Sequence, residues 1–171
     1  MLMIHAYHAA QGVQRKKIIL PDSAHGTNPA TANLCGYNVI QIQSNERGLI
    51  DPNKLESVMD EETAAIMLTN PNTLGMFETD ILKITEIVHK KGGLVYCDGA
   101  NLNAVMGKTK INTMGVDVLH FNLHKTFSTP HGGGGPGAGP VGIVDKLGPF
   151  LPVPVIEHTD GKYRLNYDCP D

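Results

Sequence analysis

The chain has 171 residues, enough for one domain with a buried core, since a domain of about 150 residues hides roughly two-thirds of its unfolded surface. Its net charge of −3 and pI near 6.2 provide no basic field for nucleic acid, and no apolar run reaches the length of a membrane span. We therefore expect no nucleic-acid or membrane partner, and a cytoplasmic location, or the mitochondrial matrix if the source is eukaryotic.

Hydrophobic periodicity predicts helices alternating with short strands along the chain. Helices are expected over residues 2–13, 27–36, 51–59 and 80–91, and strands over 17–20, 39–42, 64–69, 94–97, 116–121 and 140–144. Thr27 or Asn28 is the expected N-cap of the second helix, Gly36 its C-terminal residue, and Asp51-Pro52 the start of the third. This alternation predicts an α/β fold with a mostly parallel sheet and flanking helices.

The composition divides the chain into two parts. Residues 1–147 are predicted to form a partial α/β domain, whereas residues 148–171 begin with a proline-restricted stretch that favours an extended connector. The first helix lacks an N-cap residue and the tail lacks a closing element. We therefore expect the chain to be truncated at both ends.

Three loops that follow strands carry side chains suited to chemistry. His25, Asp98 and Lys125 each come after a predicted strand, and ligands of open α/β sheets bind at the carboxyl ends of strands. A lysine amine, a carboxylate and a flat ring are the groups that an aldehyde cofactor needs. Two simpler interpretations stay open: Lys125 as an ordinary surface lysine, and Asp98 as the cap of a helix beginning near Asn101.

Other clusters point less clearly to a site. His120, His124 and His131 lack acidic or cysteine partners at metal-ligand spacing, and Cys35, Cys97 and Cys169 form no CxxC pair, so neither a metal nor a disulfide is expected. The glycine-rich run over residues 131–137 lacks the GxxxxGK[ST] order of a phosphate-binding loop. A mobile loop or tight turn is the predicted role of this run.

Four ordered motifs make the sequence recognisable. They are SAHGTNPA at 23–30, NPNTLG at 70–75, DGANLNA at 98–104 and NLHKTF at 122–127, followed by the glycine-rich run. Together they closely resemble the glycine decarboxylase P-protein family of the glycine cleavage system, over nearly the whole chain. The resemblance implies the fold-type I fold of pyridoxal-phosphate enzymes, with this chain as the central part of the large domain of a C-terminal half or subunit 2. It also implies that the connector over residues 148–171 leads toward a small C-terminal domain.

The resemblance also implies roles for individual residues. Lys125 is expected to bind the cofactor covalently, Asp98 to pair with its pyridine nitrogen, and His25 to stack on its ring. Ala100 would pack on the opposite face of the ring. Further residues expected near the cofactor are Thr27, Thr73 and Asn101, and His124 or His25 is the expected proton shuttle. The family's phosphate-binding loop lies before the helix that begins this chain.

The activity implied by the resemblance is decarboxylation of glycine with transfer of the aminomethyl group to the lipoyl arm of the H-protein, an oxidoreductase function. Expected partners are glycine, the lipoylated H-protein, and an N-terminal half or second P-protein subunit in a homo- or hetero-oligomer. Alternatives are another fold-type I enzyme, such as an amino-acid decarboxylase or a desulfurase, and an inert structural fragment. The stretch from His25 to Pro29 favours the glycine decarboxylase.

Overall fold

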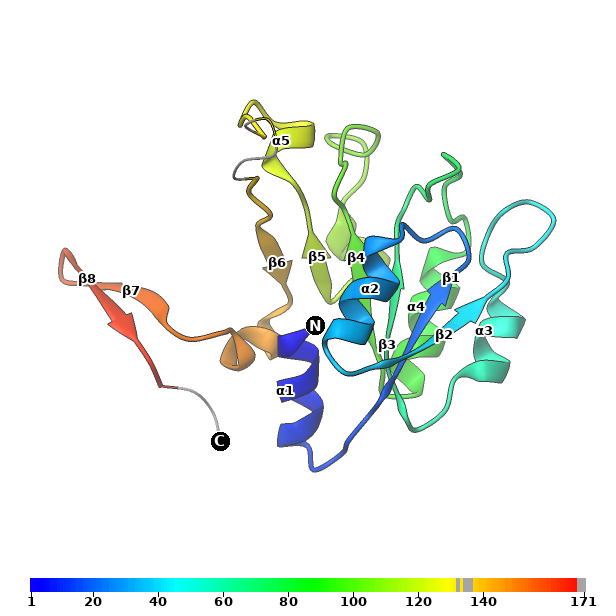
Figure 1. Cartoon of the computed structure of the whole chain (residues 1–171), viewed down its shortest axis with the longest axis horizontal. Helices are drawn as coiled ribbons and strands as arrows, with labels where there is room; N and C mark the ends of the chain where they lie inside the picture. The colour runs from blue at the N-terminus through cyan, green and yellow to red at the C-terminus, as the bar shows by residue number, and fades with distance from the viewer. Residues whose placement is uncertain (132, 134–136, 169–171) are drawn as a thin grey trace.

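The computed structural model describes residues 1–131, 133 and 137–168, and its body is one six-stranded sheet in the order β2-β1-β3-β4-β5-β6 (Figure 1). The strands are β1 (Lys17–Pro21), β2 (Asn38–Ile42), β3 (Thr63–Leu68), β4 (Leu94–Asp98), β5 (Val118–His120) and β6 (Val141–Ile143). Strands β1 to β5 are parallel, and β6 runs antiparallel to β5. The predicted mostly parallel α/β sheet is confirmed.

Helices cover both faces of this sheet (Figure 1). The covering helices are α1 (Leu2–Ala10) and α2 (Thr27–Leu34) on one face and α3 (Pro52–Val58) and α4 (Ile81–Lys90) on the other. The short helix α5 (Leu123–Thr126) follows the carboxyl end of β5, and the 3-10 helices are η1 (Ile111–Met114) and η3 (Asp145–Phe150). The sequence pattern predicts α1 to α4 but misses α5, η1 and η3, which are too short to show a periodic apolar face. Within the described ranges, no helix is long and apolar enough to cross a membrane.

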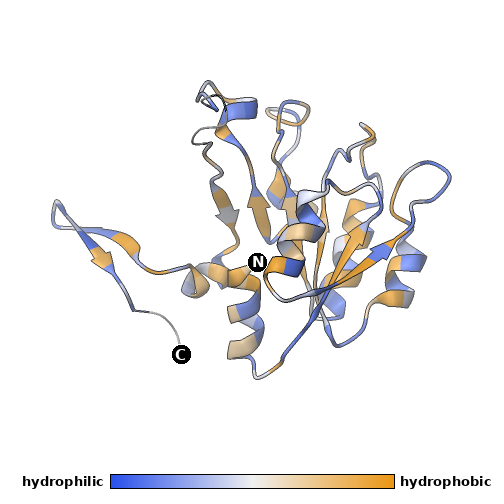
Figure 2. Cartoon of the chain, in the orientation of Figure 1, coloured by the Kyte–Doolittle hydropathy of each residue, from blue (hydrophilic) through white to orange (hydrophobic). Residues whose placement is uncertain are grey.

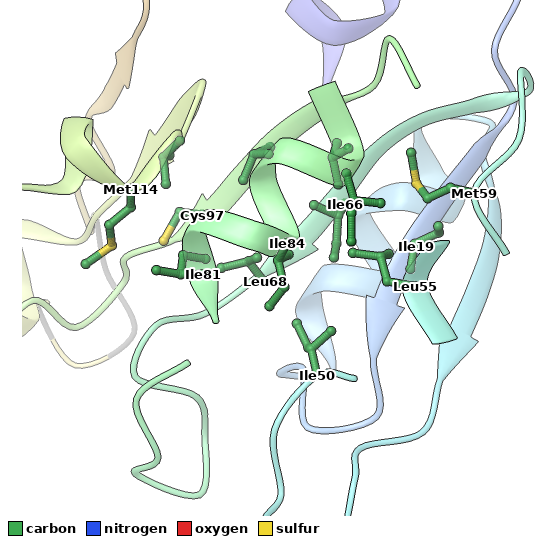
Figure 3. Close-up of a cluster of buried hydrophobic side chains, with 14 of the residues drawn as sticks. Ile19, Ile50, Leu55, Met59, Ile66, Leu68, Ile81, Ile84, Cys97 and Met114 are labelled. Carbon is green, nitrogen blue, oxygen red and sulfur yellow. The ribbon is translucent and has the colours of Figure 1, made fainter. Parts of the chain in front are cut away.

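The core consists of two apolar clusters, one on each face of the sheet. Successive side chains of a strand point to opposite faces, so Ile19 faces α3 and α4 while Ile18 and Leu20 face α1 and α2. Figure 3 shows the first cluster, in which Ile84 of α4 packs with side chains of the central strands. All six residues of β3 are buried, as expected for a parallel strand covered on both faces. Figure 2 shows apolar colour along the central strands of the sheet.

The helix ends mostly follow the sequence signals, but α1 ends at Ala10 and not at the predicted Val13, and the cap of α2 differs from the prediction. Asp51 caps α3 by accepting the Asn53 N–H at 2.9 Å, with proline in the first turn. Gly36 follows α2 with a φ of +81°, the left-handed conformation that glycine adopts without strain. The prediction that Thr27 or Asn28 caps α2 is wrong: the N-cap is Gly26, and no side-chain hydrogen bond caps this end.

The buried carboxylate of Asp117 connects several elements near the start of β5. Asp117 lies just before β5 and is 4% exposed. Its Oδ2 accepts the Val95 N–H at 2.8 Å and lies 2.7 Å from His89 Nε2, while Lys146 Nζ lies 2.7 Å from its Oδ1. One side chain thus ties together α4, β4, β5 and η3. The carboxylate is buried whereas His89 and Lys146 are partly exposed, so replacing Asp117 removes all of these contacts at once and should lower the free energy of unfolding.

The last part of the chain has more regular structure than an extended connector. Residues of η3 pack against α1, with Leu147 fully buried, so the predicted boundary at 147/148 falls inside a packed segment. Strands β7 (Val155–Thr159) and β8 (Lys162–Asn166) then form an antiparallel hairpin that extends away from the sheet (Figure 1). Asp160 and Gly161 both have positive φ, which is typical of the two-residue turn that joins hairpin strands.

A buried histidine on α1 makes stability depend on pH. His8 lies between α1 and β3 with its Nε2–H donating to Ala64 O at 2.9 Å, and its Nδ1 is buried with no partner among the described residues. Burial lowers the pKa of this imidazole below its ordinary value. The unfolded chain therefore takes up a proton below about pH 6.5 that the folded chain excludes, so the free energy of unfolding falls as the pH drops.

The expected result is a smaller pH dependence when His8 is replaced. Urea unfolding of the natural chain and of His8→Gln is measured at about pH 7.5 and about pH 5, on either side of the ordinary histidine pKa. Glutamine retains a donor for the Ala64 carbonyl but does not titrate. The natural chain should lose more stability than the variant over this interval. Equal losses in the two proteins would show that His8 takes up its proton without cost.

Candidate functional site

A cavity of about 690 Å³ opens at the carboxyl ends of β1, β3, β4 and β5. The volume lies within the range of about 300–1,000 Å³ that is usual for small-molecule and cofactor sites. His25 reaches it from the loop after β1, Asp98 from the end of β4, and Lys125 from α5 after β5. The structure therefore brings together three groups that lie up to a hundred residues apart in the chain.

Asp98 is the last residue of β4 and is 7% exposed. Its Oδ1 accepts the Ala100 N–H at 3.0 Å, which bends the chain sharply after the strand. Residues 101–110 contain turns and no helix, so the alternative in which Asp98 caps a helix near Asn101 is wrong. The Asp98 carboxylate therefore lines the cavity and caps no helix.

Lys125 lies in the one-turn helix α5, which is bonded to the loop after β4. The Leu102 N–H donates to Thr126 Oγ1 at 2.9 Å, and the Asn122 N–H donates to Ala100 O at 3.3 Å. These contacts fix the lysine segment against the loop that carries Asp98. Lys125 is exposed, as the surface-lysine interpretation expects, and it also lines the cavity.

The ring of His25 is oriented by its neighbour Thr27. The Thr27 backbone N–H donates to His25 Nδ1 at 3.2 Å, and Thr27 Oγ1 lies 2.8 Å from the same atom. Because a backbone N–H only donates, Nδ1 is the acceptor and Nε2 carries the proton of the neutral ring. On the other side, Thr73 Oγ1 donates to the carbonyl of Ser23, which joins the loop after β3 to the loop after β1.

The structure separates the predicted site residues into two groups. Those that line the cavity are Lys125, Asp98, His25, Ala100, Thr27, Thr73 and Asn101. His124 does not line it: its ring packs edge-on against His131, with centroids 4.4 Å apart, so the position gives no support to a proton shuttle at this residue. Residues 132 and 134–136 of the glycine-rich run, and Cys169, lie outside the described residues, so the predictions for them stay predictions.

Sequence reasoning missed several lining residues, among them His120, Asn122 and Tyr96. Tyr96 precedes Asp98 by two positions and so shares its face of β4, and burial raises the pKa of its hydroxyl to about 12. His120 ends the strand that pairs with β4. Side chains two positions apart in a strand share one face of the sheet, and this alternation is the signal that could identify Tyr96 and His120. Among the described residues, no group of three or more histidine, cysteine and acidic side chains is arranged to hold a metal.

Gly99 makes the close approach of β4 and β5 possible at the site. A Cβ at this position would lie 2.6 Å from Leu119 Cδ1 and 2.8 Å from His120 O, the carbonyl that accepts the Gly99 N–H at 2.7 Å. We expect Gly99→Ala to lower the free energy of unfolding by about 1–3 kcal/mol through overpacking. Urea unfolding measures the loss. The matched control is Gly26→Ala, because an added Cβ there has no described atom within 4 Å and Gly26 has no positive φ. Gly107→Ala would be a poorer control, because Gly107 has a φ of +73° and an alanine there adds backbone strain of its own.

Comparison with known proteins places the chain in a family. The sequence profile of the aminotransferase class-V family matches residues 1–134. Two relatives are a probable glycine dehydrogenase (decarboxylating) subunit 2 from Bacillus cereus, 58% identical over 172 residues, and one from Chloroherpeton thalassium, 57% identical over 175 residues. Each alignment covers 100% of this chain but only 35% and 36% of the relative. The chain thus spans about a third of the length of the curated relatives it matches.

Solved structures confirm the fold. The glycine decarboxylase (P-protein) of the glycine cleavage system, in inhibitor-bound form, superposes with a TM-score of 0.71 and 21% identity over 97% of this chain and 38% of its own. A sphingosine-1-phosphate lyase from Burkholderia pseudomallei gives a TM-score of 0.63 and 22% identity over 81% of this chain and 34% of its own. The motif resemblance to the glycine decarboxylase P-protein is borne out by these relatives, and the chain belongs to the aminotransferase class-V family.

Proposed function

We propose that this chain supplies the pyridoxal-phosphate site of a glycine-decarboxylating enzyme. The observation that carries the proposal is the meeting of Lys125, Asp98 and His25 in one cavity at the carboxyl ends of parallel strands. The curated relatives are named glycine dehydrogenase (decarboxylating) subunit 2, and they match the chain over its whole length. The decarboxylating activity, its substrate and its partners belong to the complete protein and are proposed here for this chain as part of it.

The residues present fit pyridoxal phosphate, the cofactor that the aminotransferase class-V family implies. The cavity contains a primary amine on Lys125 for an aldehyde, a largely buried carboxylate on Asp98 for a protonated ring nitrogen, and the His25 ring for stacking. When bound, the cofactor supplies an aldehyde that binds amines and a ring that accepts the electron pair left behind as carbon dioxide departs.

Each residue then has a defined task. Lys125 would hold the cofactor through its aldehyde, and its amine, when free, could accept a proton released nearby. Asp98 would hold the ring nitrogen of the cofactor, and a carboxylate at this position would favour a proton on that nitrogen. His25 presents a flat ring with a proton on Nε2, so it can stack and also donate at the same position. His25 is thus the better placed of the two predicted proton shuttles.

The proposed partners follow from the reaction. The relatives carry the designation subunit 2, which implies a companion subunit, and such a companion is the proposed partner of the complete protein. A lipoylated H-protein is the proposed acceptor of the aminomethyl group. Its disulfide takes up the electron pair left on the glycine carbon, one sulfur binding that carbon and the other becoming a thiol. Glycine is thereby oxidised and the disulfide reduced.

The test is an exchange assay in a complete protein. Residues 1–171 replace the matching segment of the Bacillus cereus relative, which is 58% identical, and this hybrid is combined with its companion subunit and lipoylated H-protein. The proposal predicts exchange of the carboxyl carbon of glycine with labelled bicarbonate, and no exchange with alanine or cysteine as substrate. A folded hybrid that assembles with its partners but exchanges no label would contradict the proposed function.

A further inference from the structure

Asp98 has a neighbour in the cavity that the proposed chemistry does not yet use. The register of β4 and β5 pairs Asp98 with His120, so the two side chains leave the sheet side by side at its carboxyl edge. His120 Nδ1 lies 3.6 Å from Asp98 Oδ1, and both residues line the cavity. The same Oδ1 accepts the Ala100 N–H, so both protein donors approach one oxygen of the carboxylate.

Asn122 determines which nitrogen of His120 carries the proton. Its amide nitrogen Nδ2 lies 3.1 Å from His120 Nε2. An amide nitrogen donates and does not accept, so Nε2 is the acceptor and the proton of the neutral ring lies on Nδ1. The Nδ1–H therefore faces Asp98. This arrangement is the less common one for a histidine, and here it is imposed by a residue only two positions away in the chain.

A backbone segment closes behind this pair and keeps it in place. The Leu123 N–H donates to Ala138 O at 3.0 Å, which brings the segment before β6 alongside the segment before α5. A Cβ on Gly139 would lie 3.0 Å from His120 Nε2 and 3.5 Å from Asn122 Nδ2. The absence of a side chain at Gly139 thus allows the two polar groups to remain in contact against the backbone.

We propose that His120 is a positioning residue for Asp98: its Nδ1–H and the Ala100 N–H together hold Oδ1, which leaves Oδ2 as the oxygen for the ring nitrogen of the cofactor. A distance of 3.6 Å exceeds that of a direct hydrogen bond, so the contact closes by a small side-chain rotation or through one water. The inference rests on the proposed function, because it adds His120 to the same cofactor site that Lys125, Asp98 and His25 form. His120 acts through Asp98 and not on the substrate.

The first measurement is the tautomer of His120 in the chain without cofactor. Histidine labelled with ¹³C and ¹⁵N distinguishes a proton on Nδ1 from one on Nε2 by its ring chemical shifts, and His120→Asn identifies the signal by its loss. We expect the Nδ1–H form in the natural chain and a shift toward the Nε2–H form in Asn122→Leu, which has no donor. An Nε2–H ring in the natural chain would overturn the proposal, whether or not the chain binds cofactor.

The second measurement is the affinity of the chain for pyridoxal phosphate. In His120→Asn the side-chain amide nitrogen replaces Nδ1–H, whereas His120→Leu keeps the bulk and removes the donor. We expect the Kd to rise about tenfold in His120→Leu and to stay within about threefold in His120→Asn, as for loss and retention of one donor to a charged group. His89→Leu removes the histidine of the other histidine–aspartate pair, outside the cavity, and should leave the Kd unchanged.

The outcomes separate the two proposals. Equal Kd values in His120→Leu and His120→Asn, or an equal rise in His89→Leu, would overturn the positioning role. If the natural chain binds no pyridoxal phosphate under any condition, the proposed cofactor site fails in this chain. The tautomer measurement, which needs no cofactor, then shows by itself whether the Nδ1–H of His120 faces Asp98. Unfolding curves for each variant exclude loss of fold as the cause of a raised Kd.

Discussion

Lys125→Ala is expected to abolish glycine exchange in the hybrid subunit, with a loss of at least about 10⁴-fold, the scale seen when a covalent catalytic group is removed. No other lysine lines the described cavity, so no neighbouring amine is placed to substitute for it. Because Lys125 is exposed, the substitution removes no buried contact and should leave the free energy of unfolding within about 0.5 kcal/mol of the natural value.

The exposed Lys83 on α4 provides the matched control for this experiment. Lys83→Ala removes a lysine of similar exposure outside the cavity and should exchange label at the natural rate. The exchange rate is measured by incorporation of labelled bicarbonate into glycine. Exchange by Lys125→Ala at more than a few per cent of the natural rate would mean that another group holds the substrate, and the assignment of Lys125 would be wrong.

Asp98→Asn is expected to lower the exchange rate about 10³-fold, because the amide keeps the shape of the side chain but cannot stabilise a cationic ring nitrogen. Among the described residues, the Asp98 carboxylate accepts the Ala100 N–H alone and faces His120, and an amide oxygen can keep both contacts. The fold should therefore persist while the chemistry is lost. Steady-state rates at saturating glycine measure the effect.

Asp117→Asn is the complementary control. Asp117 is also a buried aspartate with a histidine partner, but it lies outside the cavity and holds α4, β4 and η3. This variant should lose about 1–3 kcal/mol of stability, the scale of lost hydrogen bonds to a charged group, and retain its exchange rate where it is folded. If Asp98→Asn retained the natural rate, or if both variants lost only stability, Asp98 would be a structural residue and not the partner of the ring nitrogen.

Much of this architecture could be predicted from the sequence, because several strands, helices and helix ends have clear local signals. The strands β1 and β3 and the helix α4 have apolar patterns of the correct period and length, and Asp51-Pro52 and Gly36 are strong signals for helix ends. Because parallel strands present their carboxyl ends at one edge, the loops bearing His25, Asp98 and Lys125 were expected to converge, and they do.

What the sequence did not reveal depends on tertiary structure. The one-turn helix α5 is too short for a periodic signal and is held by contacts such as Leu102 N–H to Thr126 Oγ1. The pairing of His120 with Asp98 depends on the β4–β5 register, which only the folded sheet defines. The hairpin of β7 and β8 had a recognisable turn at Asp160-Gly161, but the nearby prolines favoured an extended interpretation.

The central claim is that the cavity is a pyridoxal-phosphate site with Lys125 as its covalent residue. The chain is incubated with pyridoxal phosphate and reduced with borohydride, which converts the bond between the aldehyde carbon and the lysine nitrogen to a stable amine, and the labelled peptide is mapped by mass spectrometry. We expect the label on Lys125, within the peptide that follows His120, and its loss in Lys125→Ala but not in Lys83→Ala. Labelling scattered over several surface lysines, or no labelling, would contradict the account.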